Sequence, residues 1–594
     1  MKRVVALALA LVMACGILVG CKSDSTDKGA IIPISLTSER FNADPGRIYY
    51  DAEAMKLCGL LYEGLTRIDE DGKVHKALAK EWTTKVNEEK GEYTLSIELN
   101  KTWWSDGRQV LAEHVVYAWK RVLDPSNNNP AAALLYDVKN ARKVKSGEMT
   151  VDDIGLSSPE DFVVEVEFEG PFDAEEFMRT VASPALVPLR EDVVSKNPTN
   201  WATKIETVVT NGPFTIKKMG GAEAVESEDG ENVEAEVTSK EDLFTIERST
   251  YYYLSGADNE DIKKYVTPYR FEMNYSKSVN DQYAAFQNGE LYYIGALSKE
   301  DYEANAKNVK TMDIPSTYTY YYNTTKAPLN DANVRKALSI AVSRDEIANI
   351  VGRGAVAATG YVPHATREYG SSKEFRAVGG NLINTAGDMS TAQSLMGGKK
   401  GTITIAYRND KLGVEAEIAQ YIKGVWEQLG LTVKLKGLDN ASYETALYNG
   451  DFDVLAIDSV GLTDDARSFL APFATRYSGT VVSLEKDAEY YTPHVTGFEN
   501  AEYDAIIDKA YAAATESEMN AALHEAEALL LEQCPATALY FDVDYYLANK
   551  NLTNVKSNFF GSRYFHKTDL KGYKPATAAT NTDANADANA ETVA

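Results

Sequence analysis

The clearest alternation along the chain lies at residues 317–322, where Thr, Tyr, Thr, Tyr, Tyr and Tyr follow one another. Side chains that repeat every two residues, with aromatic and β-branched types dominating, predict a strand. Apolar residues then recur at helical spacing in residues 334–341, which predicts a helix that Asn330 can cap. Ser343 and Glu346 have the spacing of a capping box, so a second helix is predicted directly afterwards.

A strand, a helix and another strand are predicted further along, at residues 402–407, 414–429 and 431–436. Gly430 ends the helix. Because consecutive strands joined by a helix are parallel, this part of the chain is expected to contain parallel sheet. Alternation elsewhere predicts further strands, and residues 112–123 form an amphipathic helical pattern.

The N-terminus has the layout of a secretory signal peptide, with Lys2 and Arg3 before an apolar run at residues 4–19. The run ends in Leu-Val-Gly-Cys, which resembles the site where bacterial lipoproteins are cleaved and lipidated. It is slightly shorter than the about 20 apolar residues that span a bilayer. We therefore expect residues 1–20 to be a signal peptide, Cys21 to carry lipid, and residues 21–30 to form a tether.

Length and charge narrow the class of protein. The 594 residues exceed what one hydrophobic core supports, so two or three lobes are expected. The net charge of −27 argues against a nucleic-acid partner, because phosphates require a basic surface. Residues 220–242, rich in Glu and Gly, are expected to be an exposed insertion, and residues 575–594 a disordered tail.

Two of the four cysteines remain once Cys15 leaves with the signal peptide and Cys21 is lipidated. Cys58 and Cys534 could pair, but nothing in their spacing demands it. Cys58 lies in an apolar helical run, which favours a buried free thiol.

Motifs for catalysis or cofactor binding are absent from the sequence. Residues 352–357 fit G-x-G-x-x-A, but they follow a helix instead of a strand, so they are expected to form a loop. There is no nucleophile elbow, Walker loop or H-E-x-x-H, and the six His residues show no metal-ligand spacing. We expect no enzymatic activity, no cofactor and no metal site.

Several blocks occur in the order seen in one known family. They include YEGLT at 62–66, WSDGRQVLAEHVVYAWKRVLDP at 104–125, NGPFTI at 211–216 and TYTYYYNTTKAPLNDANVRKAL at 317–338. Together they resemble the extracytoplasmic oligopeptide-binding proteins of bacterial ABC importers, solute-binding protein family 5. The resemblance implies an α/β fold like that of periplasmic binding proteins, with mixed sheets, two lobes, and the additional domain of the peptide-binding cluster.

The resemblance also implies how the chain is divided. Lobe I would comprise residues 31–66, 201–319 and 541–574, with the acidic insertion inside its second part. The extra domain would span residues 67–200 and lobe II residues 320–540. The ligand would bind between lobes that close by a hinge motion.

By the same resemblance, the ligand contacts three parts of the chain: the loop with Tyr49 and Tyr50, the strand Tyr320–Asn323, and a segment after residue 458. The candidate ligand-binding residues are Tyr49, Tyr50, Tyr320, Tyr321, Tyr322, Asn323, Leu462, Thr463, Asp464, Asp465, Arg467 and Tyr540. A peptide can be bound as an added strand through main-chain hydrogen bonds, and Tyr320–Asn323 is the predicted partner.

One departure concerns the ligand's α-ammonium group. Family members that bind free peptides carry an Asp for it, and Leu462 stands at that position here, with Ser459 in place of a Trp. Asp464 or Asp465 could supply the carboxylate from a shifted loop, and Arg467 could meet a ligand carboxylate.

The implied partners are an oligopeptide, the permease subunits of an ABC importer, and the membrane through the lipid, with the protein itself a monomer on the outer or periplasmic side. Two alternatives remain open. The ligand could be a sugar, a nickel chelate or a modified peptide, or the fold could serve a surface sensor or adhesin.

Overall fold

The computed structural model describes residues 28–36, 43–127, 129–198, 201–203, 205, 207–219, 243–253, 263–275, 277–409, 412–475 and 495–574. It also describes the backbone of two short strands, β9 (Val225–Glu226) and β10 (Asn232–Val233). The predicted signal peptide with Cys21, most of the acidic insertion and the C-terminal tail lie outside these residues. The side chains of Tyr49 and Tyr50 lie outside the description as well.

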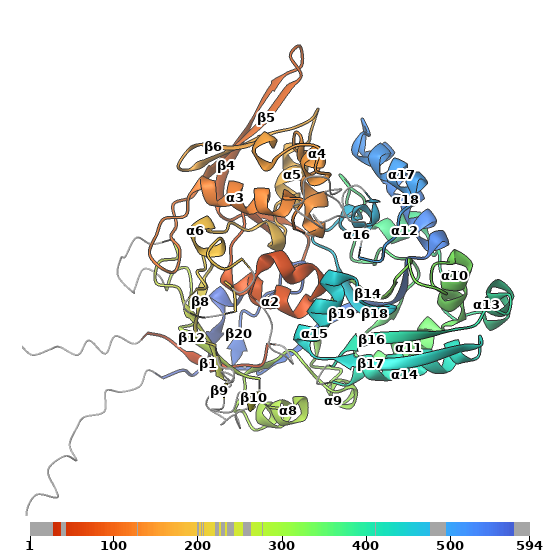
Figure 1. The fold of residues 1–594 in the computed structure, drawn as a ribbon. Coiled ribbons are helices and arrows are strands. Elements are labelled where there is room, and N and C mark those ends of the chain that lie inside the picture. The colour runs from red at the N-terminus through yellow and green to blue at the C-terminus, as the bar shows by residue number, and fades with distance from the viewer. Residues whose placement is uncertain are drawn as a thin grey trace, which may run out of the picture.

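Lobe I is built on a four-stranded sheet in the order β1-β12-β11-β8, in which only β1 and β12 are parallel. Its strands are β1 (Ile31–Pro33), β8 (Phe214–Met219), β11 (Leu243–Arg248) and β12 (Arg270–Asn274). Helix α2 (Ala52–Leu61) stands at the centre of the molecule (Figure 1). Asp51 caps α2 by accepting from two main-chain N–H groups, as carboxylates do at helix N-termini.

The extra domain has an antiparallel sheet in the order β4-β5-β7-β6, seen at the top of Figure 1. The strands are β4 (Ala79–Asn87), β5 (Glu92–Leu99), β6 (Leu156–Glu160) and β7 (Val163–Glu167). The predicted amphipathic helix is α3 (Ala112–Leu123), which packs on β6 and β7 and buries Trp119 completely. Further elements are β2 (Thr66–Ile68), β3 (Val74–Lys76), η2 (Pro130–Leu135), α4 (Ala141–Lys145), η3 (Val151–Asp153), α5 (Ala174–Thr180), η4 (Pro184–Leu186) and α6 (Glu191–Val194).

Lobe II contains the largest sheet, in the order β13-β19-β14-β18-β16-β17, with β15 paired to β19. The strands are β13 (Tyr293–Ile294), β14 (Lys310–Tyr322), β15 (Val356–Ala357), β16 (Gly401–Arg408), β17 (Leu431–Leu438), β18 (Val454–Val460) and β19 (Ala536–Ala548). β16, α14 (Val414–Glu427) and β17 form the predicted βαβ unit, and β16 and β17 are parallel. β14 and β19 are continuous through the predicted lobe boundaries at residues 320 and 540.

Helices pack against this sheet and extend to the right in Figure 1. They are α10 (Ala332–Ala341), α11 (Arg344–Val351), α12 (Phe375–Gly379), α13 (Met389–Met396), α15 (Asn440–Asn449), α16 (Arg467–Leu470), η5 (Ala471–Phe473), α17 (Ala501–Tyr511) and α18 (Glu516–Gln533). The remaining elements, nearer lobe I, are η1 (Pro45–Tyr50), α8 (Val279–Gln287), α9 (Lys299–Ala304), β20 (Leu552–Thr553), η7 (Phe565–Lys567) and β21 (Asp569–Leu570).

Local predictions in this region largely hold. Ser343 caps α11 by accepting from the N–H of Glu346, as the capping box predicts. The residue that caps α10 is Asp331 and not Asn330, because Asp331 accepts from the N–H of Asn333. Cys58 and Cys534 are both buried and unpaired, which confirms the expected free thiol. Within the described part of the chain, no helix is both long and apolar enough to cross a membrane.

Candidate functional site

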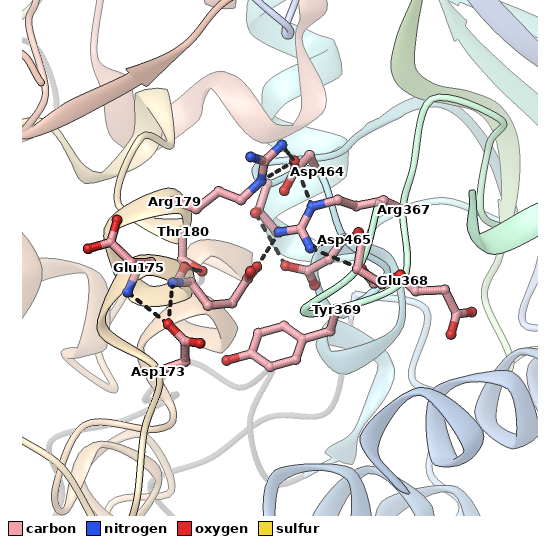
Figure 2. A network of polar contacts seen from close by, with 12 residues as sticks. Asp173, Glu175, Arg179, Thr180, Arg367, Glu368, Tyr369, Asp464 and Asp465 are labelled. Carbon is pink, nitrogen blue, oxygen red and sulfur yellow. Dashed lines mark hydrogen bonds and ion pairs between the residues drawn. The ribbon is translucent and has the colours of Figure 1, made fainter. Parts of the chain in front are cut away.

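Ion pairs join the extra domain to lobe II across the space between the lobes (Figure 2). Helix α5 supplies Glu176 and Arg179, and the loop after β18 supplies Asp464. Arg179 Nε donates to Asp464 Oδ2 at 2.6 Å, and Arg367 Nε donates to the same oxygen at 2.9 Å. Arg367 also pairs with Glu176. The carboxylate of Asp464 is therefore shared by two guanidinium groups from different parts of the fold.

A second pair lies beside it. Arg467 donates from Nε and Nη2 to the two oxygens of Asp465, both at 3.0 Å, which is the bidentate geometry that arginine and carboxylate prefer. Its Nη1 reaches Asp137 of the extra domain at 3.1 Å, and its guanidinium lies 4.3 Å from the ring centre of Tyr369. Burial alone would raise the pKa of Asp465, but the charge and hydrogen bonds of Arg467, together with the charge of Arg367, outweigh it and hold that pKa below its usual value.

We call Asp137, Glu176, Arg179, Arg367, Asp464, Asp465 and Arg467 the interlobe ion-pair cluster. Both carboxylates that the sequence offered as ammonium anchors belong to it and are already neutralised by arginines. Leu462 is buried in the hydrophobic core, and Thr463 donates to Asp465 Oδ2 at 3.3 Å. The segment 462–467 therefore connects lobe II to the extra domain through ion pairs.

The predicted role of Tyr320–Asn323 as partner of a peptide strand is wrong. Strand β14 is in the middle of its sheet, where Ser316–Tyr322 pair with β18 on one side and most of the same residues pair with β19 on the other. Its main-chain groups are already used in the ladder, so a peptide has no edge to join there.

The side chains of this segment also differ from the prediction. Tyr320 and Tyr322 are fully buried in the core of lobe II against Trp426. Asn323 donates to the carbonyl of Gly450 at 3.1 Å and accepts from Thr325, which makes it a structural residue. Alternation sends Tyr321 to the opposite face, where it lines a small cavity of about 20 Å³ with Tyr361 and Ser459.

The neighbouring strand β18 does have an open edge. β16 pairs with β18 only at Val454 and Leu455, so no strand among the described residues follows the edge from Ala456 to Val460. The N–H of Asn323 donates to Asp453, and that of Gly461 donates to Pro315. Because hydrogen-bonded and non-hydrogen-bonded pairs alternate, the main-chain groups of Asp458 and Val460 point away from β14 towards the open edge.

Lobe I lies against this open edge. The 3-10 helix η1, whose backbone includes Tyr49 and Tyr50, contacts β18. Asp51 follows directly, and its carboxylate forms an ion pair with Arg408 of β16 at 3.2 Å. The segment that the sequence predicted as a loop facing the cleft is thus a 3-10 helix in contact with lobe II.

A cavity of about 160 Å³ opens between the lobes next to the same edge. Lobe I contributes Asp51 and Glu53 from the start of α2, and lobe II contributes Tyr318, Asp458 and Tyr540 from adjacent strands. The rings of Tyr318 and Tyr540 stack with centres 4.9 Å apart. Of the ten candidate residues whose side chains the structure describes, Tyr540 alone lines this cavity.

The sequence did not single out Asp458 or Asp542. Burial raises the pKa of Asp458 to about 7, with a further contribution from the carboxylate of Asp542. Burial likewise raises the pKa of Asp542 to about 6. One signal was available, because an Asp inside a short, largely apolar strand such as Val454–Val460 is unusual and marks a site for inspection.

Two lobes with an additional domain and a cleft between them define the fold of the periplasmic binding proteins. The chain belongs to the bacterial extracellular solute-binding proteins, family 5, whose pattern matches residues 73–480. It is 28% identical over 586 residues to the dipeptide-binding protein DppE of Bacillus subtilis, covering 93% of this chain and 97% of DppE.

Solved structures agree on the fold. Listeria monocytogenes OppA bound to peptide superimposes with a TM-score of 0.73 at 21% identity, over 92% of this chain and 100% of that one. The Escherichia coli murein tripeptide binding protein MppA gives 0.71 at 21% identity, over 91% and 98%, whereas its unliganded open form gives 0.52 at 21%, over 91% and 97%.

Proposed function

We propose that the protein captures oligopeptides between its lobes and delivers them to an ABC importer, held at the membrane by a lipid on Cys21. The observation that carries the peptide part is the open edge of β18 at Asp458 and Val460. An extended peptide is recognised without regard to sequence when its main chain joins such an edge. The names of the relatives, which bind dipeptides and oligopeptides, support the same class of ligand.

Closure of the lobes would hold the peptide. η1 of lobe I contacts β18 beside the open edge, so a peptide that joins this edge would be in contact with both lobes. The interlobe ion-pair cluster then stabilises the closed arrangement from the side of the extra domain.

The test is native mass spectrometry of the purified full chain, with release and sequencing of whatever co-purifies. A mixture of short peptides is expected. A single non-peptide mass, or an empty cleft that a peptide library does not fill, would contradict the proposal and favour a different ligand. The lipid is tested separately, by the mass of the mature N-terminus and by membrane release in a Cys21→Ala variant.

A further inference from the structure

The cavity between the lobes carries more negative than positive charge. Six carboxylates line it, from Asp51, Glu53, Glu415, Asp458, Asp542 and Asp544, together with three cations, from Lys56, Arg353 and Arg408. Asp51 pairs with Arg408, Glu53 pairs with Lys56, and Asp544 pairs with Arg563 at 2.6 Å. Most of the cations that line the cavity are therefore already paired with carboxylates.

Asp458 and Asp542 differ from these carboxylates because neither forms an ion pair in the part of the chain that the structure describes. Among the described residues, no Lys, Arg or His lies within ion-pair distance of either carboxylate. Burial is the main cause that raises the pKa of both groups, and nearby acids add to it: Asp542, Asp51 and Glu53 act on Asp458. Arg408 acts on Asp458 and Lys56 on Asp542 in the opposite direction, but neither cation outweighs the effect of burial. Two partly buried carboxylates without a cation are costly in an empty site and become favourable when a cation enters.

An independent feature of the same cavity points to a ligand. Tyr318 lines it and is only 3% exposed, yet its hydroxyl has no hydrogen-bond partner within the described structure. A buried hydroxyl without a partner costs about 1–3 kcal/mol, and a ligand can remove that cost. The stacked rings of Tyr318 and Tyr540 also offer π faces, which attract cations.

The cavity lies beside the edge of β18 where we propose that the peptide binds. The main chain of Asp458 faces the open edge, while its side chain shares a sheet face with Tyr318, its direct cross-strand neighbour. A peptide that joins this edge places alternate side chains on that same face. The cavity volume of about 160 Å³ is many times the about 10–15 Å³ that one water needs, so the end of a Lys or Arg side chain can enter.

We infer that this cavity, through Asp458, Asp542 and the Tyr318–Tyr540 pair, is a subsite for an organic cation, an ammonium or guanidinium group, of the bound peptide. The inference rests on the proposed function. A metal ion is a poorer occupant, because no group of carboxylate, thiol or imidazole side chains among the described residues is arranged to bind one. The cation can come from a Lys or Arg side chain or from the peptide's own α-ammonium.

The experiment uses calorimetric titration of the full chain with alanine pentapeptides that carry one lysine at each position in turn. Norleucine replaces lysine in a matched set, and both sets are prepared with free and acetylated N-termini. We expect lysine at one position to bind about 10- to 100-fold more tightly than norleucine, even after acetylation. If the α-ammonium is the cation that binds in the cavity, acetylation of the N-terminus should weaken binding by the same factor of about 10 to 100, whatever the position of lysine.

Protein variants assign the effect to the cavity. Asp458→Asn and Asp542→Asn should each abolish most of the preference for the cation, while Asp451→Asn, an exposed acid outside the cavity, should leave it unchanged. Equal affinity for all peptides would overturn the inference and leave the proposed function standing. Binding of none would overturn both. The peptide comparison on the unmodified chain gives its answer even where a variant fails to fold.

Discussion

Arg467 is the residue on which the interlobe ion-pair cluster depends most. It is 1% exposed and contacts Asp465, Asp137, Thr180 and Tyr369, so that two carboxylates rely on one guanidinium. A buried pair adds little net stability compared with apolar residues, but the loss of one partner leaves a buried charge without compensation. Removing Arg467 is therefore expected to destabilise the protein strongly, even though the intact ion pair adds little net stability.

Arg467→Ala should lower the free energy of unfolding by about 3–5 kcal/mol, because Asp465 would remain fully buried without its bidentate partner and the partly exposed Asp137 would lose its ion pair. Urea unfolding measures this directly. The matched control is Lys509→Ala, which breaks a pair with Glu525 whose side chains are 63% and 53% exposed. That control should change stability by less than about 1 kcal/mol, and an equally small effect at Arg467 would contradict the prediction.

Asp458 should make stability depend on pH. A carboxyl whose pKa is raised in the folded state keeps its proton when the unfolded chain has lost it, so stability falls as pH rises from the ordinary value of 3.8 towards about 7. Asp458→Asn removes this dependence. The variant should match the unmodified protein below about pH 4 and exceed it by about 4 kcal/mol at about pH 8.

Urea unfolding at both pH values measures the free energy of unfolding of the variant and of the unmodified protein. Subtracting one from the other at each pH removes the contributions of the other titrating groups. Those facing Asp458 include Asp51, Glu53, Lys56, Arg353, Arg408, Glu415 and Asp542. A difference that does not change with pH would show that Asp458 ionises normally.

At the scale of elements, strand β18 decides where a peptide can be bound. It has one edge in the ladder with β14 and another that is open beyond Leu455. Its central neighbour β14 has the more conspicuous tyrosines, but its residues 317–321 are paired with a strand on both sides. The composition of a strand therefore says less about ligand binding than its place in the sheet.

Val460→Pro tests the open edge. The N–H of Val460 points away from β14, so proline removes a donor that the ladder does not use. Peptide affinity should fall by about tenfold or more, the value of a lost main-chain hydrogen bond plus local distortion. Calorimetric titration measures affinity, and circular dichroism checks the fold. Ser459→Pro, which removes a ladder donor to β14, should instead unfold part of the sheet.

At the scale of the whole molecule, the two lobes and the extra domain are held together by contacts that a hinge motion would break. Arg179 from the extra domain meets Asp464 from lobe II, and Asp51 from lobe I meets Arg408 from lobe II. If the lobes separate by the hinge motion that we propose, the pairs at the extra domain would be lost.

Arg179→Met should therefore speed peptide release about tenfold or more while association changes little, because the variant destabilises only the closed state. Stopped-flow fluorescence gives both rates. Arg108→Met, which breaks an exposed pair with Asp192 inside the extra domain, is the matched control and should leave both rates unchanged. Slower association with normal release would place Arg179 in the encounter step instead.

The sequence by itself determined the elements and the family. The alternation at residues 317–322, the capping box at Ser343 and the βαβ unit depend on side chains within a few residues of each other, so local pattern suffices. The order of short blocks gave the two-lobed fold, because that order reflects a shared arrangement and needs no coordinates.

Tertiary structure decided which strand edge is open, which acids are paired and which tyrosines face the cleft. Asp464 and Arg179 are 285 residues apart, and Arg467 and Asp137 are 330 apart, so no spacing could reveal those pairs. Alternation placed Tyr320 and Tyr321 on opposite faces, but only the tertiary structure showed that Tyr320 packs against Trp426 of α14 and that Tyr321 is buried in a separate core on the other face. A carboxylate such as Asp458 becomes informative once its neighbours are known, because its charge is stabilised or opposed through space and not along the chain.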